Sequence, residues 1–147
     1  PTDFVQVNAG INREAVGLAL RLLAAQAGDR VLDLFSGLGN FTLPLARRAA
    51  RVVGVEGEPG LVGRARDNAA RNGLANVEFH VADLAQDPGT AGWATGPYQR
   101  VLLDPPRAGA AAMLGMLGRL RPRRIVYVSC HPASLARDAG ELVHGHG

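Results

Sequence analysis

The sequence predicts an α/β protein with a doubly wound parallel sheet. Short apolar runs, which are typical of strands buried on both faces, alternate with segments whose apolar residues recur at helical spacing. Glycines and prolines separate the two kinds of segment and mark the turns between them. Because this alternation extends over nearly the whole chain, it indicates parallel strands joined by helices that cover both faces of the sheet.

The first half of the chain contains three predicted strands. Asn8 precedes an amphipathic helix that Gly28 can end, and Gly73 stands behind a later helix in the same way. After the first helix we expect, in order, a strand at 31–35 closed by a glycine turn at 36–40, a helix at 41–50, a strand at 51–56, a helix at 59–72 and a strand at 77–81.

The second half begins with a loop at 84–99, which is rich in glycine and proline and has one helical turn at Trp93. We then expect a strand at 100–103, a helix at 110–120, a strand at 125–129 and a helix at 132–142. Ligands of such sheets bind at the carboxyl ends of the strands. Residues that follow the strands are therefore the candidates for function.

Composition sets limits on the class of protein. The 147 residues, 47% of them hydrophobic, fit a single domain at 1–147, and a net charge of +3 argues only weakly for an anionic partner. The single cysteine excludes an internal disulfide, and no leader or long apolar run is present. We expect a cytoplasmic protein with no membrane segment and, since histidines are few and scattered, no metal.

The first predicted strand ends in a glycine turn that can approach a ligand closely. Gly37 and Gly39 lie in this turn, but a dinucleotide fingerprint would place a third glycine where Thr42 stands. Glu56 ends the second strand, where a carboxylate can accept hydrogen bonds from both hydroxyls of a ribose. The combination favours a nucleoside ligand, although a tight turn beside an exposed acid is also possible on structural grounds alone.

The fourth and fifth predicted strands end in residues that can react or bind. Asp104 and Arg107 flank two prolines, which either aim these side chains or simply end the strand. Cys130 follows the fifth strand, and a lone cysteine is more often inert packing than a nucleophile. A dyad of Cys130 with His131 is doubtful because neighbouring side chains on an extended segment point to opposite sides.

Five motifs together resemble the RNA uridine-5-methyltransferase family, over essentially all of the chain. They are FVQVN at 4–8, DLFSGLGN at 33–40, VEG at 55–57, DPPRAG at 104–109 and YVSCHP at 127–132. The similarity is greatest to the bacterial branch that acts on large-subunit ribosomal RNA, with the transfer-RNA branch as the alternative. One departure is His131, because the family usually has asparagine after the cysteine.

The resemblance implies a class I methyltransferase fold that binds S-adenosylmethionine. Cys130 would be the nucleophile, and Asp104 and Arg107 would lie between the cofactor and the target base. The cofactor pocket would be lined by Gln6, Phe35, Asn40, Glu56, Asp83 and Asp104, beside the turn residues Asp33, Gly37 and Gly39.

The family's chemistry also implies parts that we expect outside this chain. A thiolate adds to carbon 6 of uracil, and a general base later removes the proton from carbon 5. The resemblance places this base, and the last strands of the sheet, beyond residue 147. We therefore expect the 147-residue chain to bind cofactor without methylating RNA, and to self-associate through the open edge of the fifth strand.

Two other classes of protein remain open. A methyltransferase acting on nitrogen also uses an acidic residue or asparagine followed by two prolines, and it would not need Cys130. A cofactor-binding or RNA-binding remnant without activity would retain Cys130 only for packing.

Overall fold

The structure is a computed structural model that describes the backbone of residues 2–129 and 132–144. Side chains are described from residue 13 onward, except at positions 132, 134, 143 and 144. None of the described helices is both long and apolar enough to cross a membrane.

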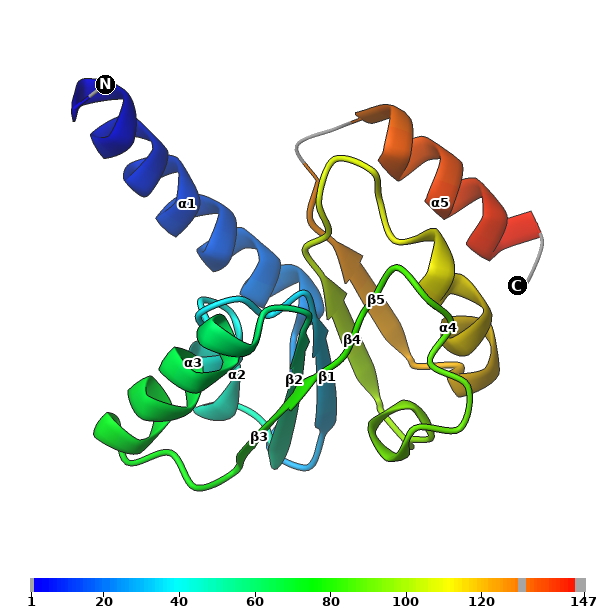
Figure 1. Cartoon of the computed structure of the whole chain (residues 1–147), viewed down its shortest axis with the longest axis horizontal. Helices are drawn as coiled ribbons and strands as arrows, with labels where there is room; N and C mark the ends of the chain where they lie inside the picture. The colour runs from blue at the N-terminus through cyan, green and yellow to red at the C-terminus, as the bar shows by residue number, and fades with distance from the viewer. Residues whose placement is uncertain (1, 130–131, 145–147) are drawn as a thin grey trace.

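A parallel sheet of five strands lies at the centre of the described chain, in the order β3-β2-β1-β4-β5 (Figure 1). The strands are β1 (Arg30–Leu34), β2 (Arg51–Glu56), β3 (Val77–Val81), β4 (Arg100–Leu103) and β5 (Arg124–Tyr127). The helices are α1 (Thr2–Leu23), α2 (Thr42–Ala46), α3 (Pro59–Arg71), α4 (Leu114–Leu120) and α5 (Pro132–His144), with 3₁₀ turns η1 (Gly92–Ala94) and η2 (Ala111–Met113).

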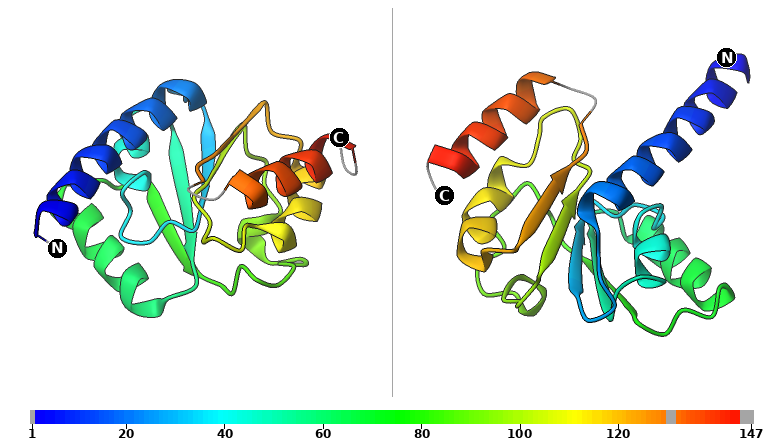
Figure 2. Two further views of the ribbon diagram at one scale, coloured as in Figure 1. Left: turned by 90° about the horizontal axis from the view of Figure 1, so that it is seen from above. Right: turned by 180° about the vertical axis from the view of Figure 1, so that it is seen from behind.

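Helices cover both faces of the sheet. Helices α1, α2 and α3 lie on one face, and α4 and α5 lie on the other (Figure 2). The chain winds outward from β1 through β2 to β3, then crosses back to place β4 on the other side of β1. This reversal puts the switch point between β1 and β4, where ligands of doubly wound sheets bind.

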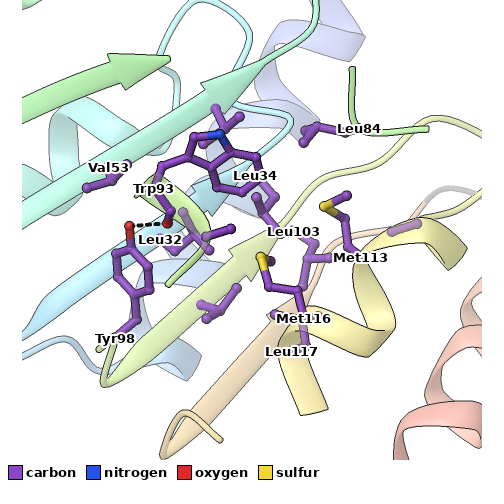
Figure 3. Close-up of a cluster of buried hydrophobic side chains, with 14 of the residues drawn as sticks. Leu32, Leu34, Val53, Leu84, Trp93, Tyr98, Leu103, Met113, Met116 and Leu117 are labelled. Carbon is purple, nitrogen blue, oxygen red and sulfur yellow. Dashed lines mark hydrogen bonds between the residues drawn. The ribbon is translucent and has the colours of Figure 1, made fainter. Parts of the chain in front are cut away.

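Alternate residues of each strand pack into the two hydrophobic cores, one on each face of the sheet. Leu32 and Leu34 of β1 pack under α4 with Trp93 and Leu103 (Figure 3). Val31 packs on the other face, under α1 and α2. Both cores are fully buried at the centre, which explains why the strands are apolar on both faces.

The predicted fold class is confirmed. Strands 51–56, 77–81 and 100–103 have the predicted bounds, and the loop 84–99 contains the predicted helical turn at Trp93. The helices after β2 and β5 differ from the prediction by one or two residues at their carboxyl ends. The helix predicted at 110–120 is instead a 3₁₀ turn at Ala111–Met113 followed by α4 at Leu114–Leu120.

The prediction was wrong at one end of each of the helices α1 and α2 and at the carboxyl ends of the strands β1 and β5. Helix α1 begins at Thr2 rather than after Asn8, since residues 2–9 contain no glycine or proline that would interrupt it. Helix α2 ends at Ala46 rather than at residue 50, and the N–H of Ala50 instead donates to the Asp29 carbonyl.

Strands β1 and β5 both end one or two residues early. Phe35 has a φ of +64°, which ends the strand that was predicted to include it. Strand β5 ends at Tyr127, although the N–H of Val128 still donates to the Leu103 carbonyl at 2.7 Å.

Candidate functional site

The candidate site lies at the carboxyl ends of β1, β2 and β4. Since β1 pairs with β2 on one side and β4 on the other, the turn after β1 lies between Glu56 and Asp104. The N–H of Asp104 donates to the Leu34 carbonyl at 3.2 Å, and the N–H of Ser36 donates to the Val55 carbonyl at 3.1 Å. These bonds continue the sheet to the point where the candidate residues begin.

The turn after β1 needs glycine for conformational reasons. Gly37 has a φ of +55° and Gly39 a φ of +91°, both in the region that residues with a side chain rarely adopt. A Cβ atom on Gly37 would meet nothing within 4 Å. The backbone conformation, rather than packing, therefore favours glycine at position 37.

Both carboxylate oxygens of Glu56 are held by backbone N–H groups. Oε1 accepts from Gly37 at 3.1 Å, and Oε2 accepts from Glu58 at 2.9 Å. The half-buried side chain is thus fixed against the glycine turn. Each oxygen has a second lone pair, so the carboxylate can accept further hydrogen bonds from a ligand.

Asp33 lies beneath the turn. It is fully buried, its Oδ2 accepts from the Thr42 hydroxyl at 2.5 Å, and its Oδ1 has no hydrogen-bond partner among the described residues. Burial, reinforced by the charges of Asp104 and Glu56, raises the pKa of Asp33 to about 7 even though the Thr42 bond opposes the shift. A dinucleotide-binding fingerprint would have glycine at position 42. Here Thr42 instead donates a hydrogen bond to the buried Asp33 carboxyl group.

The remaining described candidates are more accessible. Asn40, Asp83, Asp104 and Arg107 are exposed, and Phe35 is half-buried against the core under α4. Asp104 as a whole residue is exposed, but its carboxyl group is partly buried, and this burial raises the pKa of the group. Asp83 accepts a hydrogen bond at Oδ1 from the N–H of Ala85 at 3.0 Å, which orients it after β3.

Two candidates lie outside the part of the chain whose side chains the structure describes. Gln6 lies in α1, but its side chain is outside the described part of the chain, and Cys130 lies outside the described residues altogether. Among residues 2–129 and 132–144, no three His, Cys, Asp or Glu side chains lie close enough together to hold a metal ion.

Sequence reasoning missed two buried polar side chains near the site. The Ser36 hydroxyl is buried with no partner among the described residues, and no sequence signal marks it. Asp138 is fully buried in α5. Its position between Leu135 and Leu142, on the apolar face of a helix, was a signal that could have revealed it.

The profile of the methyltransferase domain family matches residues 25–98 of the chain. This segment runs from before β1 to just before β4 and contains the glycine turn, Glu56 and Asp83. The chain belongs to the methyltransferase domain family.

Curated relatives resemble the chain over its whole length. It is 66% identical over 147 residues to the 23S rRNA (uracil(1939)-C(5))-methyltransferase RlmD of Alkalilimnicola ehrlichii, and 58% identical to that of Stenotrophomonas maltophilia. In both comparisons the alignment covers 100% of this chain and 33% of the relative. The chain thus spans about one third of the length of these relatives, and its resemblance to the RNA uridine-5-methyltransferases is confirmed.

Solved structures agree with this assignment. The tRNA (uracil-54, C5)-methyltransferase of Pyrococcus abyssi, in complex with S-adenosyl-L-homocysteine, superposes with a TM-score of 0.74 at 34% identity, covering 88% of this chain and 31% of that one. Magnesium protoporphyrin IX methyltransferase from Synechocystis superposes with a TM-score of 0.68 at 23% identity, covering 92% of this chain and 70% of that one. This second similarity concerns the fold alone.

Proposed function

We propose that the protein containing this chain transfers a methyl group from S-adenosylmethionine to carbon 5 of a uridine in ribosomal RNA. The observation that carries the proposal is the 66% identity, over all 147 residues, to a 23S rRNA uracil-C5-methyltransferase. Transfer RNA is the alternative substrate, because the P. abyssi relative acts on tRNA. Either substrate would place the enzyme in the cytoplasm.

The residues at the ends of β1 and β2 fit the proposed cofactor. Glu56 offers two oxygens, already aimed by backbone N–H groups, to the hydroxyls of a ribose. The open space beside Gly37 is available to the rest of the ligand. Phe35, Gly39, Asn40 and Asp83 would line the same pocket, and Gln6 would belong to it as the family resemblance implies.

Cys130 would supply the nucleophile that uracil chemistry requires. Carbon 5 of uracil is too poor a nucleophile to be methylated directly, so the Cys130 thiolate adds to carbon 6 and the ring becomes an enolate. S-adenosylmethionine, when bound, would supply the electrophilic methyl group to carbon 5, and its sulfur would keep the electron pair of the broken bond to that methyl group. A base then removes the proton from carbon 5, and its electron pair re-forms the double bond as the thiolate leaves.

Asp104 and Arg107 would hold the target base. They lie on the segment that leaves β4, beside the proposed cofactor pocket, and both are exposed. The guanidinium of Arg107 can donate to a carbonyl oxygen of uracil as negative charge develops on the ring. Asp104, with its raised pKa, can hydrogen-bond the ring in either protonation state.

Methylation assays on the protein expressed from its whole coding sequence test this proposal. Large-subunit rRNA and tRNA transcripts would be incubated with S-adenosylmethionine, and the nucleosides identified by mass spectrometry. We expect 5-methyluridine in rRNA, and its loss in Cys130→Ala, which lacks the nucleophile. A product methylated on nitrogen, or full activity in Cys130→Ala, would contradict the proposal.

A further inference from the structure

Asp138 of α5 is a buried carboxylate outside the proposed cofactor pocket. Its exposed fraction is 0%, and aspartate is rarely buried to this extent unless donors surround it. Oδ2 accepts from the backbone N–H of Ala110 at 2.8 Å and from the Tyr127 hydroxyl at 2.7 Å. Oδ1 accepts from the Arg137 guanidinium at 3.1 Å.

These bonds join three segments that are far apart in the sequence. Tyr127 is the last residue of β5, Ala110 ends the loop that leaves β4, and Asp138 lies in α5. Arg137 adds a second bond to the same loop, because its Nη2 donates to the Ala108 carbonyl at 2.7 Å. Two consecutive residues of α5 therefore hold the loop after β4 at two points.

The hydrogen bonds keep the buried carboxylate ionised. Burial alone would raise the pKa of Asp138, but the bonds from Ala110, Tyr127 and Arg137 lower it below its usual value. Burial, together with the bond to Asp138, raises the pKa of the Tyr127 phenol. The donors and the acceptor thus depend on one another, and loss of one leaves buried polar groups unsatisfied.

The two segments tied to α5 carry the residues of the proposed reaction. The loop between Leu103 and Ala110 contains Asp104 and Arg107, and the stretch between Tyr127 and the start of α5 contains Cys130. We propose that Asp138, together with Tyr127 and Arg137, is a positioning residue that fixes the loop carrying Asp104 and Arg107 against the end of β5. This inference rests on the proposed function, because it assigns the hydrogen bonds of Asp138 a role in that reaction.

Tyr127→Phe gives a nearly isosteric test, because it removes only the hydroxyl. Tyr98→Phe is the matched control, because the Tyr98 hydroxyl also makes one hydrogen bond. That bond, at 2.6 Å to the Trp93 carbonyl, lies in the core beside η1 (Figure 3). Asp138→Ala removes the acceptor, whereas Asp138→Asn retains an oxygen that can accept from both Ala110 and Tyr127.

Single-turnover methylation of rRNA and calorimetric titration of S-adenosylmethionine would be measured for the whole protein and each variant. We expect Tyr127→Phe to lower the methylation rate about tenfold and Asp138→Ala about a hundredfold, as misplaced reacting groups do. Asp138→Asn should recover part of the loss, because its oxygen can accept from Ala110 and Tyr127 while its NH2 group cannot accept from Arg137. Cofactor affinity should stay within about twofold in every variant, and Tyr98→Phe should methylate at the parent rate.

The outcomes separate this inference from the proposed function. If the parent protein methylates rRNA and Tyr127→Phe matches its rate, the positioning role is wrong while the proposed function stands. Equal losses of rate in Tyr127→Phe and Tyr98→Phe would also overturn it, because a general loss of stability would explain both. A parent protein without methylation activity would overturn the proposed function and this inference together.

Discussion

The Glu56 carboxylate accepts a hydrogen bond from the backbone N–H of Gly37, with 3.1 Å between Oε1 and N. This bond joins the end of β2 to the turn after β1, across the paired strands. The acid proposed to hold the ribose is therefore also a support for the turn. Replacing it should affect the pocket in two ways.

Glu56→Ala should weaken binding of S-adenosylmethionine by about 1.5–3 kcal/mol, through loss of charge-assisted hydrogen bonds to the ribose. Isothermal titration calorimetry measures this difference directly. Glu58→Ala is the matched control, since Glu58 is an exposed neighbour that uses only its backbone N–H to bind Glu56. Equal affinity in Glu56→Ala and the parent would show that the ribose lies elsewhere.

The raised pKa of Asp33, about 7, makes the protein's stability depend on pH. A carboxyl group whose folded-state pKa is raised contributes stability that is fully present below its unfolded pKa and is lost as pH rises through the folded pKa. The free energy of unfolding should therefore fall by about 3 kcal/mol as the pH rises from about 5 to about 8. Asp33→Asn, which can still accept from Thr42, should lose that dependence.

Urea unfolding of both proteins at the two pH values checks this prediction. Asp33→Asn should gain stability relative to the parent as the pH increases. A pH dependence that is the same in the two proteins would show that Asp33 titrates normally in the folded state.

A buried ion pair at the opposite end of the sheet should matter for stability alone. Asp29 Oδ2 lies 2.6 Å from Arg100 Nε, and both residues are buried. Asp29→Ala should lower the free energy of unfolding by about 3–5 kcal/mol, because it leaves the Arg100 charge buried without its carboxylate. The exposed pair of Arg51 with Glu78 is the contrast, and Glu78→Ala should cost less than about 1 kcal/mol. Comparable losses from the two substitutions, measured by chemical denaturation, would contradict this account.

The apolar surface beside β5 predicts self-association of the 147-residue polypeptide. Within the described residues β5 pairs only with β4, and Leu18 and Leu22 of α1 are 50% and 52% exposed next to Val126 and Val128. Sedimentation velocity at rising concentration should reveal dimers, and Leu22→Arg should reduce them. Val81→Arg, at an exposed apolar position on β3, should not. A polypeptide that stays monomeric at all concentrations would contradict this prediction.

The parts of the fold that were predictable are those fixed by local pattern. Buried strands such as 51–56 and 100–103 are apolar on both faces and are bounded by turn residues, so their limits appear in the sequence. The end of α2 was not predictable, because a bond between Ala50 and Asp29, distant in the sequence, decides where the helix gives way to β2. The end of β1 depends on the left-handed backbone of Phe35, which is unusual for an aromatic residue.

The site was predictable only in outline. Ligands of parallel sheets bind at the carboxyl ends of the strands. This rule places Glu56 and Asp104 at the same end of the sheet, where the structure has them. The partners of these residues depend on tertiary contacts, so neither the burial of Asp33 against Thr42 nor the bonds of Asp138 could be deduced from spacing. The role of Cys130 stays a prediction.

Covalent trapping on RNA tests the central claim, that Cys130 attacks the target uridine, most directly. The whole protein would be incubated with S-adenosylmethionine and rRNA that carries 5-fluorouridine at the target, because fluorine cannot leave carbon 5 as a proton does. Mass spectrometry of the digested complex should find a methylated 5-fluorouridine nucleotide attached to Cys130. Methylation of ordinary rRNA by a protein that forms no such adduct at Cys130 would contradict the account.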